Sequence, residues 1–279
     1  NMKKINRRSF LAAAGLTAAA LALTACGGSA SSTASSTASS AASSEAASTS
    51  AAAELTTVEA GKLTMATNAA FPPYEMTTDA GEFEGIDIDT AKAIAEKLGL
   101  ELQIDDMDFD AALLSVQQGK ADIVMAGVTV TDERKAVMDF SDSYATGIQS
   151  IIVPEGSDIT SPDDLAGKKI GTQRGTTGYI YCSDDFGDDA VVAYDDGLTA
   201  VQALNNGQVD AVVIDNAPAK EFVAANPGLV ILDTSYAEED YAIGLAKGSA
   251  LEDAVNAALE ELKADGTLQS IVDKYITAE

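Results

Sequence analysis

The chain has 279 residues, a length typical of about two domains. Its 17 lysines and arginines stand against 44 aspartates and glutamates, and the net charge of −27 argues against a nucleic-acid partner, because phosphates attract a basic surface. It contains no histidine and only the cysteines Cys26 and Cys182. This excludes Ser-His-Asp and Cys-His catalytic pairs, histidine-ligated metals and a four-cysteine zinc site. We expect no metal and no cofactor.

Residues 1–25 have the layout of a secretory signal peptide, with a basic start followed by the apolar run 11–23. That run is short for a transmembrane helix. The segment Leu23-Thr24-Ala25-Cys26 resembles the lipobox of bacterial lipoproteins, in which the cysteine is lipidated and becomes the first mature residue. The alternative is an ordinary signal peptide with a chance cysteine. Arg7-Arg8 also resembles a twin-arginine signal, and both export routes stay open.

Residues 26–54 are expected to be a lipidated cysteine followed by a linker, because 29–53 hold only Ser, Ala and Thr apart from Glu45. Such a segment buries too little apolar surface to offset its ordering entropy. We therefore expect the protein to be tethered by lipid at the outer face of the cytoplasmic membrane. Lipidation of Cys26 would leave Cys182 outside any disulfide, as a small core or surface residue.

The remainder alternates strands and helices in two βαβ-like units. Expected elements of the first unit are strands 62–66, 100–104 and 121–126 and helices 90–98, capped by Asp87 or Asp89, and 109–118. Expected elements of the second unit and the tail are strands 148–153, 169–172, 190–194, 211–214 and 240–245, a short helix at 161–165, a helix after Gly178, and helices 197–205, 250–262 and 268–275. Open parallel sheets bind ligands near the carboxyl ends of their strands.

Three local motifs are ambiguous when each is considered alone. Glycines at 171, 175 and 178 form a strand-to-helix turn that could bind an anion or be a plain turn. Asp106, Asp108 and Asp110 have the spacing that starts a calcium loop, but the loop's sixth and twelfth positions are Ala111 and Gln117, so we expect a capping acidic turn instead. Arg134 could hold a carboxylate through two hydrogen bonds or form a surface ion pair.

Taken together, five segments resemble the polar amino-acid-binding proteins of ABC importers, in that family's order and spacing. They are 67–74 (TNAAFPPY) with 85–89 (GIDID), 126–135 (AGVTVTDERK), 138–144 (MDFSDSY), 175–178 (GTTG) and 209–215 (VDAVVID). The resemblance covers about residues 60–277, and Met107-Asp108-Phe109 is most similar to the glutamine-binding branch. It implies an α/β fold of the type II periplasmic-binding-protein kind, with a hinge and an interlobe cleft.

This resemblance also implies domain boundaries. Lobe 1 would comprise residues 55–147 plus 240–279, and lobe 2 residues 148–239. The hinge crossings would be 144–150 and 239–244.

The resemblance implies that an L-amino acid is held between the lobes. Arg134 would bind the α-carboxylate, helped by the backbone N–H of Thr129 and by Thr177; Asp215 would bind the α-ammonium, helped by the Gly127 carbonyl and the Thr129 hydroxyl. Phe71 and Phe109 would pack on the ligand side chain, and Asn68, Gln173 and Ile214 would face its far end. Each ligand charge then meets an opposite charge, as desolvation requires.

Asn68 and Gln173 depart from the family pattern, because several relatives carry Asp and the glutamine binders carry Lys there. We therefore expect no formal charge at the ligand's tail and a neutral, glutamine-like side chain; cystine and small aliphatic amino acids stay open. The expected function is capture of this amino acid by lobe closure, by a monomer that delivers it to an ABC permease.

Two alternatives remain. One is an exported enzyme of the same fold, similar to cyclohexadienyl dehydratases, with Glu75 or Asp215 as a catalytic carboxyl group. The other is a sensor domain, although no signalling module follows Glu279 in the sequence given.

Overall fold

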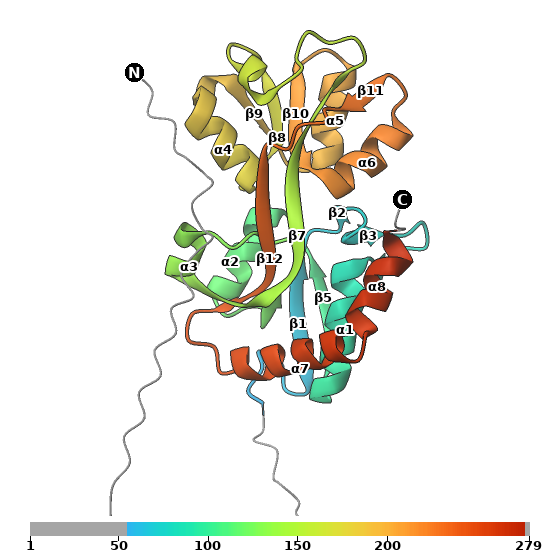
Figure 1. Cartoon of the computed structure of the whole chain (residues 1–279). Coiled ribbons are helices and arrows are strands. Elements are labelled where there is room, and N and C mark those ends of the chain that lie inside the picture. The colour runs from blue at the N-terminus through green and yellow to red at the C-terminus, as the bar shows by residue number, and fades with distance from the viewer. Residues whose placement is uncertain (1–54, 277–279) are drawn as a thin grey trace, which may run out of the picture. The chain divides into compact units, whose positions relative to one another are not determined.

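The computed structural model describes residues 55–276 (Figure 1). The expected signal peptide, the lipidation site at Cys26 and the linker lie outside the described residues. Within 55–276, no helix combines the length and the apolar character needed to cross a membrane. The architecture is mixed α/β, with two groups of elements joined by two long strands.

We call the lower group in Figure 1 lobe 1. Its strand β1 pairs in parallel with β5 and β6, as the sequence predicts for a βαβ unit. The elements of lobe 1 are β1 (Lys62–Thr67), α1 (Ile86–Leu98), β5 (Glu101–Asp106), α2 (Phe109–Gln117), β6 (Ile123–Val124), α3 (Asp132–Val137), α7 (Glu252–Ala264), α8 (Thr267–Tyr275) and a small sheet of β2 (Ala70–Phe71), β3 (Glu75–Thr77) and β4 (Phe83–Glu84). Lobe 1 is thus built from both ends of the described chain.

Lobe 2 is the upper group in Figure 1, where β8 pairs in parallel with β9 and β10. Its elements are η1 (Pro162–Leu165), β8 (Ile170–Gln173), α4 (Thr177–Phe186), η2 (Asp188–Ala190), β9 (Val191–Tyr194), α5 (Gly197–Asn205), β10 (Ala211–Asp215), α6 (Asn216–Ala225) and β11 (Leu229–Ile231). Cys182 lies on α4 and is fully buried against lobe 2 residues such as Ile151 and Val213, so it is a core residue.

Two antiparallel strands run between the lobes: β7 (Met138–Pro154) and β12 (Ala237–Ala246). They join both halves into one sheet of nine strands within residues 55–276, in the order β5-β1-β6-β12-β7-β10-β8-β9, with β11 beside β7. The register of the pair shifts around Tyr241 and Ala242, at the middle of the crossing. The expected hinge segments 144–150 and 239–244 fall on these two strands.

Helix α1 begins four residues earlier than the sequence predicted. Gly85 precedes it with φ 134°, and a side chain there would collide with the Tyr74 carbonyl oxygen, so only glycine fits. Asp87 is therefore not the N-cap; it lies in the first turn and is fully buried. Ile88 and Ile94 are fully buried, and each such isoleucine contributes about 1.5–3 kcal/mol of hydrophobic free energy.

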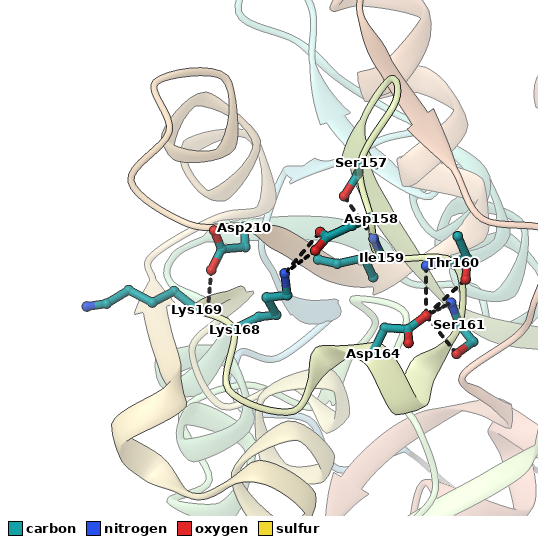
Figure 2. Close-up of polar contacts among 9 residues, drawn as sticks. All are labelled: Ser157, Asp158, Ile159, Thr160, Ser161, Asp164, Lys168, Lys169 and Asp210. Atoms are coloured by element: carbon teal, nitrogen blue, oxygen red, sulfur yellow. Dashed lines mark hydrogen bonds and ion pairs between the residues drawn. The ribbon is translucent and has the colours of Figure 1, made fainter.

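A loop on lobe 2 leads from β7 to β8 and is held by side-chain hydrogen bonds (Figure 2). Asp164 Oδ2 accepts from the backbone nitrogens of Thr160 and Ser161, at 3.0 and 2.9 Å, and from both their hydroxyls. Ser161 and Asp164 form the capping box of η1, and these bonds lower the pKa of Asp164. The ion pair of Lys168 with Asp158, at 2.9 Å, joins the two ends of the loop.

Candidate functional site

A cavity lies between the lobes, and nine of the ten residues expected at the ligand line it. Its walls are Asn68, Phe71, Glu75, Phe109, Ala126, Gly127, Thr129, Arg134, Gln173, Thr176, Thr177 and Asp215. The cavity volume is about 20 Å³, close to the room that one water molecule needs. An amino acid is larger, so its entry requires the two lobes to move apart.

Arg134 lies on α3, a helix that the sequence analysis did not predict. The Thr131 hydroxyl caps this helix by accepting from the Arg134 backbone nitrogen at 3.2 Å. The guanidinium is 8 % exposed; Nη1 donates to the Thr129 carbonyl at 2.8 Å and Nη2 to the Gly175 carbonyl of lobe 2 at 3.1 Å. It also lies 5.4 Å above the Phe109 ring centre. Arg134 is thus a buried cation whose geometry is fixed by both lobes.

Asp215 ends β10 and precedes α6, so it reaches the cavity from lobe 2. Its Oδ2 accepts from Gln149 Nε2 at 2.7 Å. Burial, together with the neighbouring Glu239 carboxylate, raises the pKa of Asp215 to about 7. Gly147 on β7 leaves room for this carboxylate, because a Cβ there would lie 2.6 Å from Asp215 Oδ1 and 2.5 Å from the Tyr241 ring.

Two amides bridge the lobes at another part of the cavity wall. Gln173 Nε2, from the end of β8, donates to Asn68 Oδ1 at 2.8 Å, and Asn68 Nδ2 donates to the Met107 carbonyl at 2.9 Å. Both side chains are buried. They present neutral polar groups to the cavity. Ile214, which was expected beside them, is not among the lining residues; its Cδ1 packs against Gly197 beneath α5.

Glu75 adds a carboxyl group that was expected in the cleft only for an enzyme. It is fully buried, lines the cavity and lies beside Asp87. Asp87 Oδ2 accepts from the Gly127 backbone nitrogen at 2.9 Å and from the Tyr144 hydroxyl at 2.8 Å. Burial raises the pKa of Asp87 to about 6, and burial and Asp87 raise that of Glu75 well above its ordinary value. Burial beside a second carboxyl group therefore favours the protonated form of Glu75.

Residues 63–278 match the family of bacterial extracellular solute-binding proteins, family 3. The chain belongs to this family. The solute-binding protein is 32 % identical to the probable histidine-binding protein of Neisseria gonorrhoeae over 99 % of this chain and 98 % of the relative. It is 33 % identical to the L-cystine-binding protein TcyJ of Escherichia coli K12, over 79 % of this chain and 85 % of the relative.

Among solved structures, the solute-binding protein is similar to an ancestral arginine-binding protein bound to glutamine. The TM-score is 0.74 and the identity 43 %, covering 78 % of this chain and 99 % of the other. The expected family and the type II periplasmic-binding fold are thereby confirmed.

Two buried acids of the solute-binding protein lie at the cavity besides the expected ligand-binding residues: Glu75 in the wall, which the sequence suggested only as a catalytic carboxyl group, and Glu239 behind it, which the sequence did not suggest. Neither lies in a motif that singles it out; Glu75 follows Pro72-Pro73-Tyr74, and Glu239 stands between Glu238 and Asp240. The alternation of the β12 strand carries a weak signal, since Glu239 faces inward while Glu238 and Asp240 are exposed. Within residues 55–276, no cluster of acidic or cysteine side chains has an arrangement that could hold a metal ion.

Proposed function

We propose that this protein is the extracytoplasmic receptor of an ABC importer and that it captures a free L-amino acid by closing its lobes. One observation carries the proposal: Arg134 of lobe 1 and Asp215 of lobe 2, of opposite charge, line one buried cavity. A zwitterion supplies a carboxylate for the first and an ammonium for the second. Relatives named for histidine, cystine and arginine binding, and one bound to glutamine, support an amino acid as the ligand.

Capture follows from this division of the site between two lobes. A ligand held by Arg134 and Asp215 favours the closed arrangement by the difference between its affinities for the closed and open forms. The α-carboxylate would be bound by Arg134, the backbone N–H of Thr129 and the amino end of α4 at Thr177, where helix N–H groups have no partner within the helix. The ammonium would be bound by Asp215, the Gly127 carbonyl and the Thr129 hydroxyl.

For the side chain we propose a neutral, glutamine-like ligand. Phe71 and Phe109 offer apolar faces, while Asn68 and Gln173 offer amides and Glu75 a buried carboxyl group whose pKa is raised. A cationic side chain is the second candidate, because Glu75 would become an ion-pair partner when ionised and one relative is named for arginine binding. Thermal-shift measurements with each of the twenty amino acids separate the two: the largest stabilisation should come from glutamine in the first case and arginine or lysine in the second.

The role we propose is binding and not catalysis. The enzyme alternative requires a catalytic carboxyl group in the cleft, and turnover of prephenate by the purified protein would support it.

We also propose that the protein acts as a lipid-anchored monomer beside a membrane permease. The anchor is tested by the mass of the amino-terminal peptide of the protein purified from membranes, which should carry a diacylglyceryl group on Cys26.

The decisive test of ligand capture is replacement of Arg134. Arg134→Ala leaves the ligand carboxylate without its cation in a buried site, so calorimetry should show at least about a hundredfold loss of affinity for the amino acid found in the screen, or about 2.8 kcal/mol. Arg174→Ala is the matched control, because that guanidinium is exposed on lobe 2. Wild-type affinity in Arg134→Ala would refute the proposed function.

A further inference from the structure

Glu239 is a buried carboxylate on the hinge strand β12 that bonds to residues from both lobes. Its Oε2 accepts from Thr129 Oγ1 of lobe 1 at 3.0 Å and from Thr177 Oγ1, the first residue of α4 in lobe 2, at 2.9 Å. Gln149 Nε2 on β7 donates to the same oxygen at 3.1 Å. Glu239 is 6 % exposed and does not itself line the cavity. Three donors from three parts of the chain thus converge on one oxygen.

These bonds fix the direction of the O–H bonds of the two threonine hydroxyls that line the cavity. A carboxylate can only accept, so the single protons of Thr129 Oγ1 and Thr177 Oγ1 both point toward Glu239. The two hydroxyl oxygens therefore present only lone pairs toward the cavity, and lone pairs accept hydrogen bonds. Together with Asp215 they form a wall made of acceptors, which suits an ammonium group and repels a carboxylate. Thr177 is left to meet the α-carboxylate through its backbone N–H and not through its hydroxyl.

The same bonds depend on closure of the lobes. Thr129 belongs to lobe 1 and Thr177 to lobe 2, and their hydroxyl oxygens are 3.5 Å apart only because the lobes meet. Separation of the lobes takes at least one donor from Glu239. Loss of a donor leaves a buried carboxylate less well hydrogen-bonded, which is unfavourable. Glu239 therefore favours the closed arrangement, in which both threonine hydroxyls donate to it.

We propose that Glu239 is a positioning residue that clasps the two lobes together and orients the Thr129 and Thr177 hydroxyls as acceptors for the ligand's ammonium group. The role toward the ligand's ammonium group rests on the proposed function. The clasp, meaning the hydrogen bonds of Glu239 to both lobes, does not depend on a ligand. Gln149 couples the clasp to Asp215, because its Nε2 donates to both carboxylates. Strand β12 of the hinge thereby contributes to ligand recognition through Glu239.

Glu239→Gln is the informative variant, since it keeps the size of the side chain but replaces one acceptor oxygen by a donor. The neutral amide oxygen can take the place of Oε2, but it accepts hydrogen bonds more weakly than a carboxylate, so the two hydroxyl protons are held less firmly away from the cavity. We expect calorimetric titration with L-glutamine and with L-arginine to show at least a tenfold loss for whichever of the two the wild type binds. Glu238→Gln, the exposed neighbour on the same strand, should bind within twofold of wild type. An affinity of Glu239→Gln within threefold of wild type would overturn the proposal.

A second measurement separates positioning from mere support of the fold. Thr177→Val removes one hydroxyl, so Glu239→Gln should cost less affinity in that background than in wild type, whereas Thr177→Ser should restore the full cost. A general loosening of the fold would give the same cost in every background, and equal costs would overturn the proposal.

The clasp is also testable without any ligand. Small-angle X-ray scattering of the purified protein should give a larger radius of gyration for Glu239→Gln than for wild type and Glu238→Gln. If the wild type binds none of the amino acids in the screen, the proposed function fails and this scattering comparison alone decides; equal radii would then overturn the clasp.

Discussion

At the scale of single residues, the site depends on a guanidinium and several carboxyl groups buried close together. Arg134 and Asp215 could be located from the sequence because each lies in a segment that resembles a known family. Glu239 could not, and Glu75 was suggested only as a catalytic carboxyl group, because burial of an acid is decided by which elements pack over it and not by its neighbours in the chain. The hydrogen-bond partners of Glu239 come from positions as far apart as 129 and 177.

The raised pKa of Asp215, about 7, predicts pH-dependent ligand binding. An ammonium beside Asp215 stabilises the ionised carboxylate and lowers its pKa, so the complex holds fewer protons than the unliganded protein. Affinity should therefore rise with pH through about 7, with release of up to one proton on binding. Calorimetry of the amino acid found in the screen, in buffers of different ionisation enthalpy, measures this release directly.

Two controls accompany this prediction. Asp215→Asn should bind weakly and lose most of the pH dependence around 7. Asp87, with a pKa of about 6, lies beside Glu75 in lobe 1. These two groups contribute to the pH dependence of binding only if the ligand changes their charge. An affinity that is constant between about pH 6 and pH 8 would contradict the assignment of Asp215 to the ammonium.

At the scale of elements, the alternation of strands and helices was predictable, and most errors lie at helix boundaries and in short elements. Helix 90–98 was expected to begin after a capping aspartate. Helix α1 instead begins at Ile86, and its N-cap is Gly85, whose positive φ is favourable for glycine. Helices α3 and α6 were not predicted; α3 has only six residues, and α6 carries Pro218 in its first turn, a position that tolerates proline. Strand 121–126 shrank to β6, because only Ile123 and Val124 pair.

The cap of η1 gives a prediction at this scale. Asp164→Ala removes the acceptor of four hydrogen bonds in the loop of Figure 2, so it should lower the midpoint of thermal unfolding by about 2–4 °C. Amino-acid affinity should not change, since the loop does not line the cavity. Glu155→Ala, which replaces an exposed acid near the start of the same loop, is the matched control and should have a smaller effect. A shift in ligand affinity for Asp164→Ala would contradict the separation of loop and site.

At the scale of the whole molecule, the two-lobe α/β fold was predictable from its periodicity and its family resemblance. The continuity of the sheet was not, because strand 148–153 turned out to be one end of the 17-residue β7. Periodicity finds a buried strand, but it does not show that the same strand continues through the hinge. That continuity is the reason why residues of β7 and β12, such as Gln149 and Glu239, reach the cavity residues of both lobes.

The position of α7 and α8 in lobe 1 has a consequence for how the polypeptide acquires its shape. These last helices pack on α1, near the beginning of the described chain, and β12 fills the gap between β6 and β7. A ribosome makes the amino-terminal part first, so the first lobe stays unfinished until residues 237–276 have emerged. Lobe 2 lies entirely between those two parts, so all of its residues are made before lobe 1 can be completed.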